Sequence, residues 1–311
     1  MLSRVAERLY WMARYHERTE DLCRLTDAYT HLLMDLPEGS EMGWDMLIRI
    51  LDANASYESN YRVYGESGVL KFLLADSRNP SSIVSSVSAM RENARTTRDE
   101  LPEQAWEYTN ELHLYTQENA AKSTGRRKRY QFLDHVMMSC QQMHGFLGAT
   151  LSRDHAYRFI NMGHLIERAD MTTRVLDVGA AAILSREKPN PTFDPLLWGS
   201  LLRALSSISS YREYMGAVIE PASVADLVVR ELAHPRSVIF CLRGIQRDLN
   251  EMPNNSRAMG VLDEAIKEVS GFSIRDKNLP KLHGLIEGIQ NRLNAINDVI
   301  ADSWFYHRDP N

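Results

Sequence analysis

The sequence predicts an all-α protein, a helical bundle of about ten helices formed by two diverged tandem copies of one unit. Apolar residues recur at the spacing of helices almost everywhere, as at Val5, Leu9 and Met12, whereas the strict alternation typical of strands is hard to find. Similar segments also recur in the same order in the two halves of the chain. The periodicity indicates the fold class, and the recurrence indicates the arrangement in two halves.

Proline and glycine mark the expected ends of the helices. Candidate breaks lie at residues 36–39, 64–68, 79–80, 101–102, 124–125, 189–191, 234–235, 252–253 and 279–280. Several of these prolines are expected in the first turn of a helix, where the missing N–H is not needed. Asn79 is a candidate cap for one such helix.

Three pairs of segments carry the duplication. Residues 12–27 resemble residues 162–177 at an offset of 150, and both contain a Glu-Arg pair. Residues 44–51 resemble 198–205 at an offset of 154, and residues 79–83 resemble 234–238 at an offset of 155. Because the order is preserved, we expect two helical repeats, 1–150 and 151–311, packed as one domain and related by a pseudo-twofold axis.

Composition excludes several classes of function. With 311 residues, of which 44% are apolar, the chain can bury a substantial core. Its net charge of -5 gives no bulk electrostatic reason to bind nucleic acid or an anionic membrane. The three cysteines are far apart, unlike a disulfide framework or a zinc cluster. No apolar run of about eighteen residues appears, so we expect a cytoplasmic protein with no membrane partner.

The charged residues of the first helix share one face. This face lies opposite the apolar stripe of the helix. Its residues are Arg14, Glu17, Glu20, Asp21, Arg24 and Asp27. A solvated face is the simplest interpretation, because Glu20 and Arg24 form a favourable i,i+4 pair that needs no function.

The matching helix of the second half is apolar nearly all round, from about residue 157 to residue 184, which predicts that it is buried. Its Glu167 and Arg174 share a face with Ile160 and Val178, so these charges are expected inside the protein, where they must be paired. We therefore expect a Glu/Arg network near the pseudo-axis. It either fixes the packing of the two halves or lines a ligand cleft.

A third motif points to an anion. Pro235 in the first turn of a helix would place Arg236 beside the positive end of the helix dipole, where a cation is unfavourable. An anionic group is therefore expected there. It is either an internal carboxylate or a phosphate or carboxylate ligand held together with Ser237.

Signals for metal or nucleotide binding are weak. A di-iron bundle needs two Glu-x-x-His motifs on facing helices, and the chain has one, Glu231-x-x-His234, cut off by a proline. His164 and Glu167 could supply two ligands, but a satisfied interior histidine is the commoner role. No phosphate loop or nucleophile elbow appears, so no metal and no cofactor are expected. The basic run at 126–130 is interpreted as a solvated loop, with an acidic partner or nucleic acid as the alternative.

Three motifs of this chain resemble the alpha-E family. They are Tyr-Trp-x-x-Arg-x-x-Glu-Arg at 10–18, Gly-His-x-x-Glu-Arg-Ala-Asp at 163–170 and Pro-Arg-Ser-Val at 235–238, and the likeness spans nearly the whole chain. The family is a helical domain of unknown function. The resemblance implies an association with circularly permuted ATP-grasp ligases, often with a transglutaminase-like protein and sometimes with a proteasome-related peptidase. It thereby implies a system that forms amide bonds or tags peptides.

The resemblance implies a non-catalytic helical partner of an ATP-grasp ligase that binds the ligase or a peptide or carboxylate substrate. The alternative is an enzyme of the same pathway, with Glu17 or Glu167 as general base and Arg168 or Arg236 stabilising an anion. No catalytic residue is assigned. The candidate binding or structural centre consists of Arg14, Glu17, Arg18, His164, Glu167, Arg168, Asp170, Arg174, Arg236 and Ser237.

Overall fold

The computed structural model describes residues 1–36, 42–184, 193–274, 279 and 281–306. Within these ranges the fold is all-α, with fourteen α-helices and no strand. None of the described helices combines the length and the apolar character that a membrane crossing needs. The breaks expected at 36–39, 189–191 and 279–280 fall wholly or partly outside the described residues.

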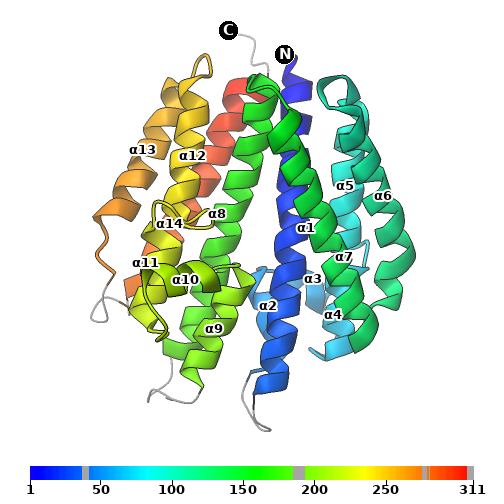
Figure 1. Cartoon of the computed structure of the whole chain (residues 1–311), viewed down its shortest axis with the longest axis vertical. Coiled ribbons are helices and arrows are strands. Elements are labelled where there is room, and N and C mark those ends of the chain that lie inside the picture. Colours follow the sequence, from blue (N-terminus) through cyan, green and yellow to red (C-terminus); the bar gives the residue numbers. More distant parts are fainter. Residues whose placement is uncertain (37–41, 185–192, 275–278, 280, 307–311) are drawn as a thin grey trace.

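Two long helices form the centre of the molecule (Figure 1). α1 (Ser3–Asp35) and α8 (His155–Leu184) lie side by side and make the most extensive contact between any two elements. Both are buried on several sides, because apolar residues such as Leu9 on α1 and Met162 on α8 recur around the helix axis. The prediction that the second of these helices is buried is confirmed.

Three further long helices flank each central helix (Figure 1). On the side of α1 these are α5 (Ile83–Thr96), α6 (Glu103–Asn119) and α7 (Arg126–Thr150). On the side of α8 they are α12 (Val238–Asn250), α13 (Ser256–Gly271) and α14 (Leu282–Ile300). α5 and α7 pack on α1 as α12 and α14 pack on α8, while α6 and α13 contact the flanking helices. Single turns of other helix types lie at Arg98–Glu100, Ala120–Lys122 and Ala301–Phe305.

Six short helices close the end of the bundle opposite the N-terminus (Figure 1). They are α2 (Asp45–Ile50), α3 (Asn54–Glu58), α4 (Glu66–Leu74), α9 (Asp194–Ala204), α10 (Ile208–Tyr214) and α11 (Pro221–Arg230). α9 packs on α1 and α2 packs on α8, so each half covers part of the other half's central helix. These short helices explain why the described helices outnumber the ten or so expected. Asp52 and Ser206, each with φ of 51°, follow α2 and α9 without a proline or glycine to mark the break.

Each of the two helices that follow the matched proline motifs has a serine as its N-cap. Ser82 caps α5 and Ser237 caps α12, and each hydroxyl accepts a hydrogen bond from the backbone N–H three residues on. Pro80 and Pro235 lie two residues before these caps, so the expectation that they occupy the first helical turn is wrong. Asn79 is not the cap either, since its side chain holds the preceding turn together.

Other contacts recur between the halves at the offsets seen in the sequence. The hydroxyl of Tyr57 donates to Val63 O at 2.8 Å, and that of Tyr211 donates to Val218 O at 2.8 Å. The short helices, the serine caps and the flanking helices follow the same order in both halves. The duplication and its pseudo-twofold axis stay predictions, and these paired contacts support them.

The close approach of α1 and α8 predicts a strong effect at Gly163. A Cβ on Gly163 would lie 2.5 Å from Tyr10 O and 3.0 Å from Ala13 Cβ, so Gly163→Ala must push the two helices apart. We expect the free energy of unfolding to fall by about 1–3 kcal/mol. Gly145→Ala on α7 is the matched control, because nothing lies within 4 Å of its added Cβ.

The control variant is expected to keep or gain stability, by up to about 1 kcal/mol, through the higher helix propensity of alanine. Urea unfolding of both variants measures the difference. Equal unfolding midpoints would show that the backbones of α1 and α8 do not touch at Gly163.

Candidate functional site

The first Glu-Arg cluster is built around Glu167 on α8. Arg14 Nε donates to Glu167 Oε2 at 2.5 Å, and Arg18 Nε donates to Glu167 Oε1 at 2.6 Å. Arg14 also donates through a terminal nitrogen to Asn297 Oδ1 at 2.9 Å, and the Tyr10 hydroxyl donates to the same oxygen at 2.8 Å. The carboxylate of one half is therefore held by two arginines of the other.

The second cluster repeats this arrangement with the halves exchanged. Arg168 on α8 binds Glu17 on α1 through two parallel hydrogen bonds, Nε to Oε1 at 2.7 Å and a terminal nitrogen to Oε2 at 2.8 Å. Arg236 approaches Glu17 Oε1 at 3.3 Å. Together with the pair between Arg18 and Glu167, this gives two reciprocal Glu-Arg bridges between the central helices.

Arg236 also binds two acidic side chains on α1. It donates to Asp21 Oδ1 at 2.6 Å and lies 3.4 Å from Glu20 Oε1. Arg24 is hydrogen-bonded to Glu20 as well. The anion expected beside Arg236 is thus a set of internal carboxylates, the first of the two alternatives.

The charged face of α1 is buried, so the interpretation as a solvated face is wrong. Glu17 is 0% exposed, and Glu20, Asp21 and Arg24 are buried with it. The pattern along α1 could not distinguish the two cases, because Glu17 and Asp21 are covered by Arg168 and Arg236, which lie far away in the sequence. Asp27, at the end of the face, is the member that stays partly exposed.

The arginines keep both motif glutamates ionised. Burial by itself raises the pKa of Glu167, but Arg14 and Arg18 outweigh it and lower the pKa to about 2. Burial is likewise opposed at Glu17, where Arg168 and Arg236 hold the pKa well below its usual range. Both carboxylates therefore stay charged at any physiological pH.

Asp21 behaves in the opposite way. Burial raises its pKa to about 7, with Arg236 opposing the rise and Glu17 adding to it. Its Oδ2 has no hydrogen-bond partner among the described residues. Asp21 is 2% exposed, so this carboxyl cannot touch a substrate in the present conformation.

A cavity of about 290 Å³ lies beside the Glu167 cluster. Its lining residues are Arg18, Leu22, Leu51, Asp52, Ser81, Glu167, Asp170, Met171 and Arg174. Arg174 Nε donates to Asp170 Oδ2 at 2.8 Å, and both side chains are only partly buried. Arginine side chains can bind a carboxylate here, while the aspartates can accept N–H groups of a peptide or an amine.

The cavity borders a segment, residues 79–83, whose sequence matches residues 234–238. Residues 79–83 match residues 234–238, so Ser81 stands at the position of Arg236. In the second half Arg236 fills its site and contacts three carboxylates of α1. Serine is too short to reach across, and the space beside Glu167 and Asp170 stays open.

The remaining predicted residues have other surroundings. His164 shares a hydrogen bond with His16 and not with a glutamate. Ser237 caps α12 and also donates to Glu231 O at 2.5 Å, so it serves the local helix start. Ser81 and Asp52 were missed by sequence reasoning, since a serine and an aspartate in loops give no signal before the fold places them beside the motif.

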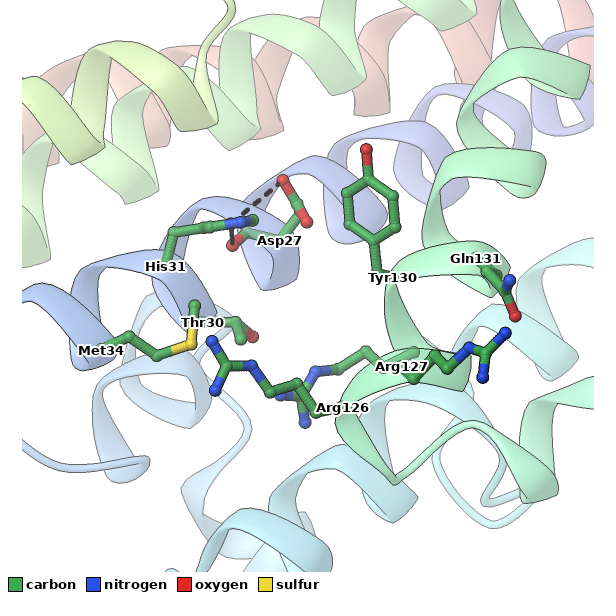
Figure 2. Close-up of a pocket in the computed structure, with 9 residues that line it drawn as sticks. Asp27, Thr30, His31, Met34, Arg126, Arg127, Tyr130 and Gln131 are labelled. Atoms are coloured by element: carbon green, nitrogen blue, oxygen red, sulfur yellow. Dashed lines mark hydrogen bonds and ion pairs between the residues drawn. The ribbon is translucent and has the colours of Figure 1, made fainter.

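The basic run lines a different and larger cavity, of about 510 Å³ (Figure 2). Arg126 and Tyr130 of α7 lie on the side of Asp27 and His31 of α1, while Arg127 extends away from α1 toward Gln131. The run forms the first turn of α7, so the interpretation as a loop is wrong. Its exposed arginines can bind an anionic group, but the cavity does not touch the Glu-Arg clusters.

The fold and the reciprocal Glu-Arg bridges define an all-α protein with a charged, internally paired centre. The alpha-E family, described as a predicted alpha-helical domain with a conserved ER motif, matches residues 1–305. The chain belongs to this family.

Uncharacterized proteins of Mycobacterium bovis and of two Mycobacterium tuberculosis strains are each 25% identical to this chain over 338 residues. The aligned region covers 96% of this chain and 36% of each relative, so the chain spans little more than a third of their length. No solved structure matches the chain.

The buried bridges predict a large cost for removing one carboxylate. Glu167→Ala leaves Arg14 and Arg18 without their anion in the interior, and we expect a loss of about 3–5 kcal/mol in the free energy of unfolding. Glu107→Ala on α6 is the control, because Glu107 is exposed, and its loss is expected to stay below about 0.5 kcal/mol. Urea unfolding measures both; similar losses would mean that the bridge contributes nothing to stability.

The low pKa of Glu167 also predicts a dependence on pH. Since the folded-state pKa of about 2 lies below the ordinary value of 4.5, the stabilisation is complete above pH 4.5 and is lost as the pH falls toward 2. We expect the stability difference between wild type and Glu167→Gln to shrink by about 3 kcal/mol across this window. Unfolding at a series of pH values measures this stability difference. A difference that stays constant with pH would contradict the low pKa of Glu167.

Proposed function

We propose that this chain is a non-catalytic helical partner of an ATP-grasp-type amide or peptide ligase, and that it binds the ligase or a peptide or carboxylate substrate. The resemblance to the alpha-E family suggests the ligase. The observation that supports a non-catalytic role is the pairing of the two motif glutamates, Glu17 and Glu167. Both are buried and held by arginines of the opposite half.

The same observation counts against the enzymatic alternative. A general base works best when its pKa lies near the working pH, and a carboxylate with a pKa of about 2, such as Glu167, takes up protons poorly. Arg168 and Arg236 are engaged by Glu17 and Asp21, so they offer no ready site for a developing anion. Asp21, whose pKa is about 7, is closed off from solvent.

The cavity beside Glu167 supports the binding part of the proposal. Arg18 and Arg174 line it together with Asp52 and Asp170, so it offers cations and anions within one small space. This combination suits a peptide segment or a peptide terminus, which presents a carboxylate together with N–H groups. A volume of about 290 Å³ fits one or two residues rather than a folded domain.

The length of the relatives supports a partnership. In the mycobacterial proteins the region that resembles this chain makes up 36% of the polypeptide, so there the helical domain is joined to a larger protein. Within the proposal the complex is cytoplasmic, in keeping with three buried and unpaired thiols. A transglutaminase-like protein and a proteasome-related peptidase act in the same system.

Filling the cavity tests the proposal with little risk to the fold. Ser81→Arg gives the first half the arginine that the second half has at Arg236, and the new side chain can pair with Glu167 and Asp170. We expect the variant to stay folded but to bind the peptide substrate of the ligase at least about tenfold more weakly. Ser77→Arg, an exposed change on the same loop outside the cavity lining, is expected to bind as wild type does.

The measurements are co-purification with the ATP-grasp ligase, isothermal titration with its peptide substrate, and ATP turnover with and without this chain. The isolated chain is expected not to hydrolyse ATP, and the ligase is expected to co-purify with it. Robust ATP turnover by the chain alone would reject the non-catalytic role. Equal binding by Ser81→Arg and Ser77→Arg would reject the cavity as the binding site.

A further inference from the structure

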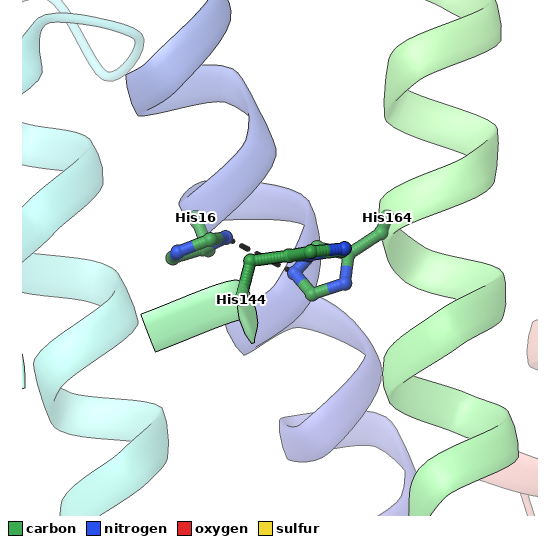
Figure 3. Close-up of side chains that lie close together, drawn as sticks. All are labelled: His16, His144 and His164. Atoms are coloured by element: carbon green, nitrogen blue, oxygen red, sulfur yellow. Dashed lines mark hydrogen bonds between the residues drawn. The ribbon is translucent and has the colours of Figure 1, made fainter. Parts of the chain in front are cut away.

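Three histidines from three long helices lie close together (Figure 3). His16 comes from α1, His144 from α7 and His164 from α8. One ring nitrogen of each lies within 4.8 Å of the other two. His16 and His164 are buried, with exposed fractions of 1% and 3%, and His144 is partly exposed. The ring centroids of His144 and His164 are 4.9 Å apart, and those of His16 and His164 are 5.0 Å apart.

A backbone carbonyl fixes the tautomer of His16. Its Nε2 lies 3.0 Å from Cys140 O, and because a carbonyl oxygen only accepts, this nitrogen must carry the hydrogen. In the neutral ring the lone pair then sits on Nδ1, which faces His164 Nε2 at 3.1 Å. A metal-bound histidine has the same arrangement, with its second nitrogen donating to a carbonyl or carboxylate.

The distance between His16 and His164 is close to that between two ligands of a metal ion. Zn²⁺ binds imidazole nitrogen at about 2.0–2.1 Å, so two ligands of a tetrahedral ion lie about 3.4 Å apart. The 3.1 Å between His16 and His164 is near this value. His144 must move closer, and its partly exposed ring leaves it room to do so.

We propose that His16, His144 and His164 bind one late first-row divalent metal ion, such as Zn²⁺. Neutral imidazoles are ligands that such ions prefer. When the metal binds, the proton of His164 moves from Nε2 to Nδ1, so that Nε2 can coordinate the ion. No proton is released in this step. Three protein ligands leave the fourth tetrahedral position for water or for an oxygen of a bound ligand.

This proposal departs from the sequence expectation of a protein without metal. That expectation came from the missing Glu-x-x-His pairs, which are read from spacing along one helix. The three histidines here lie on three different helices, so no spacing within one segment relates them. The ion would join α7 to both central helices.

Titration of untagged, chelator-treated protein with Zn²⁺ tests the site. We expect one Zn²⁺ per chain and a thermal unfolding midpoint that rises with Zn²⁺. His144→Ala, which removes a partly exposed ligand and leaves the buried pair intact, is expected to lower the affinity at least about 100-fold. His135→Ala is the control on the same helix, because His135 is exposed and outside the cluster, and it is expected to bind as wild type does.

Co²⁺ gives a second readout through its visible absorption, which intensifies when nitrogen ligands hold the ion in a tetrahedral site. We expect this absorption in wild type and in His135→Ala, and its loss in His144→Ala. Circular dichroism checks that each variant is folded. The proposal is overturned if wild type binds no Zn²⁺ stoichiometrically, or if His144→Ala and His135→Ala bind it with equal affinity.

Discussion

The reciprocal bridges between α1 and α8 are the constraint on which the rest of the structure depends. Two carboxylates, Glu17 and Glu167, are buried at the contact between the central helices, and an unpaired charge there would cost several kcal/mol. Arg168 and Arg18 can satisfy them only if the two helices lie side by side in one register. The contact at Gly163, where no side chain intervenes, lets them come that close.

The pairing also explains what the centre can do. Arginines that hold a carboxylate ionised make it a poor proton acceptor and a rigid part of the interior. Where the pairing is complete, around Arg236, the space is filled. Where the matching loop carries Ser81, a charged cavity remains beside the motif. A difference of one side chain between two segments that match in sequence, Ser81 against Arg236, thus distinguishes a packing site from a candidate binding site.

Several features could be predicted because they depend on local pattern. Helical periodicity gave the all-α class, and the apolar circumference of 157–184 correctly placed Glu167 in the interior. The expectation of an anion beside Arg236 was also correct. It was reached from a helix start that the structure corrects, since Arg236 precedes the Ser237 cap and its partners lie on another helix.

The sequence by itself determined the all-α class and the burial of the helix that carries Glu167, because both follow from the spacing of apolar residues along one segment. Only the tertiary structure decided that the charged face of α1 is covered, that Ser81 borders a cavity, and that His144 meets two histidines of other helices. Each of these depends on which helices pack together and in what register. That choice is made by contacts between residues more than a hundred positions apart, such as Arg14 with Glu167, which no periodicity along the chain encodes.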